Sequence, residues 1–160
     1  MINRILLILA LFVAGCGYTS RSLIESNIRS IYVDIFDNET FRRGLEFDLT
    51  RAVKEEILFR TKLQIVDRKR ADTVIFGKII DVQEHVLIEN PDAEVVESRV
   101  TVIADVLWVD RRTGRVLMDQ KNVSAAAEFI ATRNEDVKTG EIEAFVELAE
   151  KIVNLMEERW

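Results

Sequence analysis

The feature that most constrains the fold is an alternation of apolar and polar residues from Val95 to Asp110. Successive side chains of a strand point to opposite faces, so this pattern predicts a long antiparallel strand with one face buried. The residues expected on the buried face are Val96, Val100, Val102, Ala104, Val106 and Trp108. The other face carries Glu97, Arg99, Thr101 and Asp105. A second layer must therefore cover the apolar face.

Two more strands flank this one in the sequence. Thr73 to Ile88 is the strand before it, and residues 89–93 form a turn because Asn-Pro and the following Asp favour one. Residues 110–115 form a hairpin turn in which Gly114 is available for a positive φ. The next strand runs from Val116 to about Phe129. The three strands together predict an antiparallel meander.

Two helices are predicted from apolar residues at three- and four-residue spacing. The first runs from about Phe41 to Arg60, with Asn38 or Thr40 as its N-terminal cap. Its apolar residues are Leu45, Leu49, Ala52, Val53 and Ile57. The last helix begins at Thr139 or at the earlier Asn134. Its apolar residues are Ile142, Phe145, Val146, Ala149, Ile152, Val153 and Met156.

The remaining strand signal lies before the first helix, at residues 30–36, and residues 62–66 could add a short strand. A right-handed crossover through the first helix places the strand at 30–36 parallel to the one at 73–88. The order strand, helix, three-strand meander, helix predicts a two-layer α+β sandwich. We expect a mixed four-stranded sheet with two helices on one face, in a single domain over residues 30–160.

The N-terminus carries an export signal. One positive charge precedes the apolar run Ile5–Val13, which is too short for a membrane span, since a spanning helix needs about 20 residues. The motif Val13-Ala14-Gly15-Cys16 resembles the lipobox of bacterial lipoproteins. That resemblance implies a signal peptide over residues 1–15, with lipid attached to Cys16 and fatty acids such as palmitate in the anchor. Residues 16–29 are then the lipidated N-terminus and tether.

Gly17 bears on the destination of such a lipoprotein. An aspartate after the cysteine commonly retains these proteins in the inner membrane, and here glycine stands there. The resemblance therefore implies a lipid-anchored outer-membrane protein with its domain facing the periplasm or lodged in a barrel. The other interpretation of Cys16 is a free, buried cysteine, and a single cysteine predicts no disulfide framework.

The composition argues against several classes of protein. With 22 Lys plus Arg against 28 Asp plus Glu, the formal net charge is −6, whereas a nucleic-acid binder needs a basic face. His85 is the only histidine, and the sequence has no metal-ligand spacing, nucleophile elbow or phosphate loop. We therefore expect a binding or scaffold protein without catalytic residues, metal or cofactor. The triplet Arg68-Lys69-Arg70 is interpreted as a solvated loop.

Several segments together resemble the lipopolysaccharide-assembly lipoprotein family (LptE-like). They are Ala14-Gly15-Cys16-Gly17-Tyr18, Ser30-Ile31-Tyr32-Val33, Phe36-Asp37-Asn38-Glu39-Thr40, the helix with Leu45 and Leu49, and the stretch from Ala71 to Ile79. The resemblance implies an outer-membrane-anchored lipoprotein that assembles with an LptD-type β-barrel and assists lipopolysaccharide transport and insertion into the outer leaflet. It also implies that basic loop residues meet lipid A phosphates. The residues that fit are Arg133 before the last helix and a second basic tip, Arg111, Arg112 and Arg115.

A rival interpretation belongs to another functional class. The chain could be an anchored periplasmic accessory subunit of a secretion, export or efflux system, without lipopolysaccharide contact. Both interpretations need a lipid anchor and an exposed partner face. The face expected to dock on a barrel carries Thr101, Ile103 and Leu107, with Tyr32 or Ile31 on the first strand.

Overall fold

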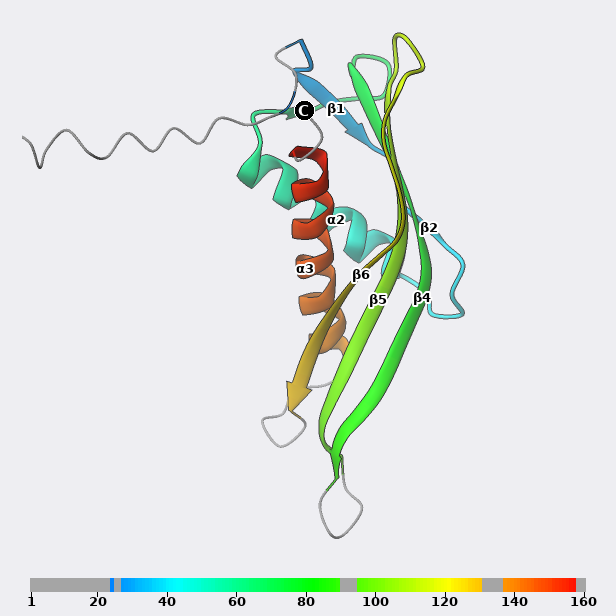
Figure 1. Ribbon diagram of the computed structural model, residues 1–160, viewed down its shortest axis with the longest axis vertical. Coiled ribbons are helices and arrows are strands. Elements are labelled where there is room, and N and C mark those ends of the chain that lie inside the picture. Colours follow the sequence, from blue (N-terminus) through cyan, green and yellow to red (C-terminus); the bar gives the residue numbers. More distant parts are fainter. Residues whose placement is uncertain (1–23, 25–26, 90–94, 131–136, 158–160) are drawn as a thin grey trace, which may run out of the picture.

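The computed structural model describes residue 24 and residues 27–89, 95–130 and 137–157. Its elements are β1 (Ser30–Val33), β2 (Asp37–Asn38), α2 (Leu45–Arg60), β3 (Gln64–Ile65), β4 (Thr73–Glu89), β5 (Val95–Asp110), β6 (Val116–Ile130) and α3 (Val137–Glu157). Both helices lie on one face of the sheet, and no described helix covers the other face (Figure 1). The predicted two-layer α+β architecture is confirmed.

The sheet has the strand order β3-β1-β4-β5-β6, and β2 pairs with β4 outside this path. β1 runs parallel to β4, with Ile31 opposite Thr73, as the predicted crossover requires. β4, β5 and β6 form the antiparallel meander. The four expected strands are therefore present, and the two-residue strands β2 and β3 bring the total of described strands to six.

The first strand is shorter than the sequence pattern predicts. It ends at Val33 because the backbone N–H of Phe36 turns away from the sheet and donates to Thr50 Oγ1 of α2, at 3.0 Å. Pairing with β4 resumes at Asp37, which lies opposite Lys78. A hydrogen bond to a helix side chain thus interrupts the strand and produces β2.

The core lies between the helices and the sheet. On β5, the described members of the expected buried face are at most 1% exposed, apart from the half-buried Val96. On α2, four of the five predicted positions are buried and Ala52 is partly buried. One continuous apolar cluster joins both helices to the sheet. The alternation and the first helical stripe therefore predicted these faces correctly.

The start of the first helix was predicted incorrectly. α2 begins at Leu45, four residues later than expected, and its N-cap is Gly44 with φ +89° and no side-chain cap. The side chain of Asn38 is used inside the preceding loop, where its Oδ1 accepts the backbone N–H of Thr40 at 2.9 Å. Glu46 accepts the N–H of Gly44 at 3.1 Å. Thr40 Oγ1 donates to Asn38 Oδ1 at 2.7 Å and accepts the N–H of Arg42 at 3.2 Å, so both predicted capping side chains bind within the loop and neither caps the helix.

The last helix begins at Val137, between the two expected starts. Five predicted apolar positions on it are buried: Phe145, Ala149, Ile152, Val153 and Met156. Ile142 and Val146, in contrast, are 43% and 46% exposed, so this part of the stripe was wrong. Ala144 and Leu148 are fully buried in their place. The helix is therefore rotated relative to the predicted stripe.

Candidate functional site

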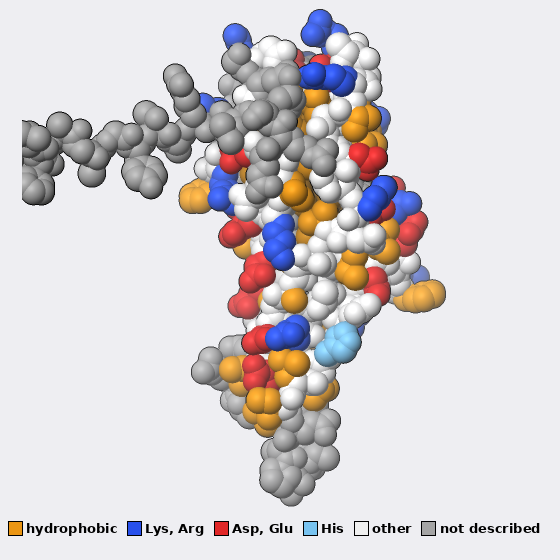
Figure 2. Space-filling view, in the orientation of Figure 1, with side chains coloured by type: hydrophobic (Ala, Val, Ile, Leu, Met, Phe, Trp, Pro, Cys, Tyr) orange, Lys and Arg blue, Asp and Glu red, His pale blue; other side chains and the backbone are white. Residues whose placement is uncertain are grey.

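One end of the domain gathers three segments that are distant in the sequence: residues 27–30, 66–73 and 109–116. The backbone N–H of Arg111 donates to the carbonyl oxygen of Asp72 at 2.9 Å, and Asp72 Oδ2 accepts the N–H of Arg29 at 3.0 Å. We call these three segments the basic end. They lie at the top of Figures 1 and 2, where Lys and Arg side chains are gathered.

The β5–β6 hairpin presents the predicted arginines on this end. Asp110 Oδ1 accepts the backbone N–H groups of Thr113 at 2.9 Å and Arg112 at 2.8 Å, and these bonds hold the pKa of Asp110 below its usual value. Gly114 closes the turn with φ +73°, a conformation that favours glycine. Because the carboxylate binds backbone, it leaves the neighbouring arginine side chains exposed to solvent.

A cleft of about 550 Å³ opens between the three segments. Its lining residues are Asn27, Ile28, Arg70, Ala71, Asp72, Asp110, Arg111 and Arg112. Arg70 belongs to the triplet that sequence reasoning treated as a solvated loop, so its part in this cleft was missed. The only signal was two clusters of cations in separate loops of an acidic chain. Their proximity depends on the sheet, which aligns the start of β4 with the end of β5.

The fourth predicted arginine, Arg133, lies outside the described residues. Ile130, the last residue of β6, is at the opposite end of that strand from Val116. A strand of 15 residues is about 50 Å long, so Ile130 and the hairpin arginines lie at opposite ends of the sheet.

The sheet face without helices is mixed in character. Thr101, Ile103 and Leu107 are half-buried on it, as expected for that face of the alternation. On β1 the residue on this face is Tyr32, because Ile31 is fully buried in the core. Charged pairs lie beside these residues, among them Lys78 with Glu39 at 2.8 Å and Lys121 with Asp105 at 3.1 Å. A shallow hollow of about 160 Å³ separates the two lysines.

The far end of the domain is formed by the end of β4 and the start of β5, which extend beyond the helices (Figure 1). Val86, Leu87 and Ile88 are 41–50% exposed there. His85 is also exposed on β4. Within the described ranges, no group of three or more His, Cys, Asp or Glu side chains could hold a metal ion. The exposed side chains of Val86, Leu87 and Ile88 give this end an apolar surface.

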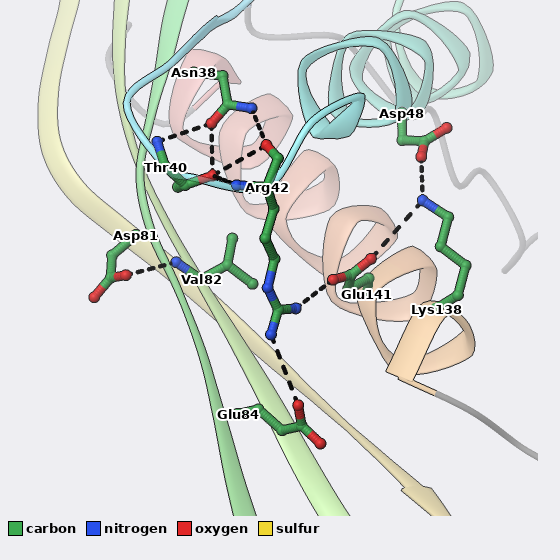
Figure 3. A network of polar contacts seen from close by, with 9 residues as sticks. All are labelled: Asn38, Thr40, Arg42, Asp48, Asp81, Val82, Glu84, Lys138 and Glu141. Carbon is green, nitrogen blue, oxygen red and sulfur yellow. Dashed lines mark hydrogen bonds and ion pairs between the residues drawn. The ribbon is translucent and has the colours of Figure 1, made fainter.

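A polar network fixes the start of α3 (Figure 3). Arg42, in the loop before α2, contacts Glu141 of α3 at 2.5 Å and Glu84 of β4 at 3.7 Å. Lys138 of α3 pairs with Asp48 of α2 and lies 3.8 Å from Glu141. The side chain of Glu141 is only 8% exposed, so the network joins the two helices to the sheet at a buried carboxylate. Its role is to position these elements.

An α+β domain with an uncovered mixed sheet face, an apolar far end and a basic end has the features of a binding protein that docks on other molecules. The helices of the described regions are too short or too polar to cross a membrane. The family model described as "LptE: Lipopolysaccharide-assembly" matches residues 28–156, and the chain belongs to this family. It is accordingly a lipopolysaccharide-assembly lipoprotein in the general sense.

Solved structures share the fold at low identity. The uncharacterized lipoprotein B of Nitrosomonas europaea has a TM-score of 0.53 and 12% identity, over 89% of this chain and 90% of that one. A minor lipoprotein of Acinetobacter baumannii has a TM-score of 0.52 and 11% identity, over 82% and 94%. The hypothetical protein CT253 of Chlamydia trachomatis has a TM-score of 0.54 and 8% identity, over 80% and 98%. No curated protein sequence matches the chain.

Proposed function

We propose that this protein is anchored to the outer membrane by lipid on Cys16, assembles with an LptD-type β-barrel and assists lipopolysaccharide transport and insertion into the outer leaflet. The observation that carries the proposal is membership of the lipopolysaccharide-assembly family over residues 28–156. The lipobox ends at Cys16, and eleven residues separate it from the matched region, so it lies on the N-terminal side of the domain where an anchor would be attached.

Two surfaces support a barrel as the partner. The uncovered sheet face combines half-buried Ile103 and Leu107 with charged pairs, and the interior walls of outer-membrane barrels are polar. The far end adds the exposed apolar residues Val86, Leu87 and Ile88. A mixed surface of this kind suits an interface with a largely polar wall and with apolar contact at the far end.

Co-purification from outer membranes tests the partnership. We expect the wild-type protein to bring down a large β-barrel, and the Cys16→Ala protein, exported by another signal, to do the same because the domain makes the contact. The variant Ile103→Glu/Leu107→Glu should lose the barrel. Its matched control, Ile142→Glu/Val146→Glu, changes exposed residues of α3 and should keep it. Recovery of a transport ATPase or an efflux pump would favour the rival accessory-subunit function, and recovery of no partner would contradict both.

The anchor has its own test. Mass spectrometry of the mature protein should show a chain that begins at Cys16 and carries acyl groups. Cys16→Ala should block lipid attachment and processing at that residue without changing the thermal unfolding of the domain, because the described core begins after it. An unmodified thiol in the mature wild-type protein would contradict the anchor.

We also propose that the basic loops contact the phosphates of lipopolysaccharide, since guanidinium groups bind phosphate bidentately. The two predicted sets belong to separate segments of the chain, so each is tested with its own variant. Lipopolysaccharide binding should be weaker in the triple variant Arg111→Glu/Arg112→Glu/Arg115→Glu, and also in the single variant Arg133→Glu. A higher salt concentration should weaken binding by the wild-type protein in the same way, because salt screens these charges. Unchanged binding in both variants would contradict these contacts.

A further inference from the structure

The basic end carries an excess of positive charge that its own contacts leave uncompensated. It holds seven Lys or Arg side chains and three Asp side chains, in a chain whose net charge is −6. Asp72 and Asp110 accept backbone N–H groups, and the side chain of Asp72 also accepts the hydroxyl of Ser30. Asp67 pairs with Arg70 at 3.0 Å. Two of the three carboxylates therefore bind backbone groups in place of a Lys or Arg side chain, and seven cations against three carboxylates leave this end with a formal excess of four positive charges.

Several of the cations are free to meet an anion. Among the described residues, Lys69 and Arg112 have no ion-pair partner, and both are exposed. Arg111 donates only its Nε, to the carbonyl oxygen of Ala71 at 2.7 Å, so its terminal nitrogens remain at the surface of the cleft. These groups present hydrogen-bond donors in the geometry that phosphate oxygens accept.

The first continuous described segment also starts at this end, at Asn27. Asn27 and Ile28 line the cleft together with Arg70, and Ile28 is 7% exposed in the core. Cys16 lies eleven residues before Asn27, and an extended chain of that length spans at most about 40 Å. A lipid on Cys16 would therefore keep the basic end within about 40 Å of the membrane surface, where its charge can decide which part of the domain faces the headgroups.

We propose that the basic end rests on anionic phospholipid headgroups of the leaflet that holds the anchor. The inference depends on the proposed lipid at Cys16, needs no lipopolysaccharide, and adds Lys69 and Arg70 to the hairpin arginines. Anionic headgroups attract basic residues within a Debye length of the surface, and the excess charge of this end supplies that attraction. The contact orients the domain so that its far end points away from the leaflet and stays available to a partner.

Fluorescence energy transfer on reconstituted vesicles tests this orientation. Because Cys16 is the only cysteine and carries the lipid, Thr113→Cys at the basic end or His85→Cys near the far end can be labelled alone in the mature lipidated protein. The two positions are about 40 Å apart along the sheet. In phosphatidylcholine vesicles with about one third phosphatidylglycerol and an acceptor on the headgroups, we expect more transfer from residue 113 than from residue 85.

The controls separate this inference from the anchor. Lys69→Glu/Arg70→Glu/Arg112→Glu, or about 0.5 M salt, should abolish the excess transfer. Arg43→Glu/Arg51→Glu/Lys54→Glu, which changes the net charge equally near α2, should preserve it. Equal transfer from both positions in protein that still floats with the vesicles would overturn the inference, as would an excess that appears only after lipopolysaccharide is added. Failure to float with neutral vesicles would instead contradict the anchor, and with it the inference.

Discussion

The ring of Phe36 lies against the backbone of Gly77, where an added Cβ would be only 2.1 Å from Cε2 of the ring. Phe36 is 1% exposed, and its backbone N–H is bound by Thr50 of α2. The contact joins the segment before α2 to the middle of β4, directly beside the pairing of Asp37 with Lys78. Two segments that carry the family resemblance thus meet at one point of the core.

Gly77→Ala should destabilise the domain because a buried ring and backbone must separate to admit the methyl group. Overpacking of this kind costs about 1–3 kcal/mol. Chemical denaturation measures the loss. In the double variant Phe36→Ala/Gly77→Ala, the alanine at residue 77 should cost far less, because the ring is gone. An equal cost of Gly77→Ala in both backgrounds would show that the contact does not limit packing.

The buried helix faces give paired tests. Leu49→Asp should lower the free energy of unfolding by roughly 3–5 kcal/mol, because it places an unpaired charge at a position that is 0% exposed. Phe47→Asp, on the same helix but at 61% exposure, should cost about 0.5 kcal/mol or less. Phe145→Asp and Val146→Asp form the same comparison on α3. Similar thermal unfolding within either pair would mean that the assigned faces are wrong.

Arg42→Ala should leave the nearly buried carboxylate of Glu141 with Lys138 as its remaining cation, at 3.8 Å. Breaking a buried pair costs about 3–5 kcal/mol, and since Arg42 is 40% exposed we expect about 2 kcal/mol by urea denaturation. The control is Arg51→Ala, which removes an exposed pair and should cost under about 1 kcal/mol. Arg42→Met/Glu141→Leu should recover most of the loss. If Arg42→Ala lowers the free energy of unfolding no more than the control does, the network does not contribute to the stability of the domain.

Acid stability should depend on Asp72. Hydrogen bonds from the backbone N–H of Arg29 and from Ser30 hold the pKa of Asp72 below its usual value of about 3.9. A lowered folded-state pKa contributes stability that is present above the unfolded pKa and is lost as the pH falls through the folded pKa. Asp72→Asn should therefore be less stable than wild type near neutral pH, with a gap that narrows below about pH 4.

Unfolding titrations over this pH range measure that gap. The matched control is Asp67→Asn, which changes an 82% exposed carboxylate in the same loop. A gap between wild type and Asp72→Asn that stays constant with pH would show that the carboxylate is not proton-linked to folding.

Much of the fold was predictable because its signals are local. The alternation of apolar and polar residues from Val95 to Asp110 indicates which face of the strand is buried. A strand with one apolar face needs a second layer that covers this face. The three- and four-residue spacing on residues 45–57 predicted the buried face of α2 in the same way. The lipobox is likewise a local signal, because it consists of four consecutive residues. Lipid attachment at Cys16 remains a prediction.

Local patterns were insufficient where burial depends on another element. Ile142 and Val146 fit a helical stripe, but α3 turns Ala144 and Leu148 toward the core instead, because packing against the sheet and α2 sets the rotation of the helix. Residues 34–36 have strand character, yet the hydrogen bond from Phe36 to Thr50 ends β1. Such outcomes depend on partners many residues away.

The sequence by itself determined the fold class, the sheet-facing sides of β5 and α2, the acidic balance and the candidate anchor, since each follows from neighbouring residues or from composition. Only the tertiary structure decided that Arg70 joins Arg111 and Arg112 around one cleft beside Asn27. The physical reason is that strand pairing places residues about 40 positions apart side by side, as in the pairing of Thr73 on β4 with Asp110 on β5, and no local period encodes that register.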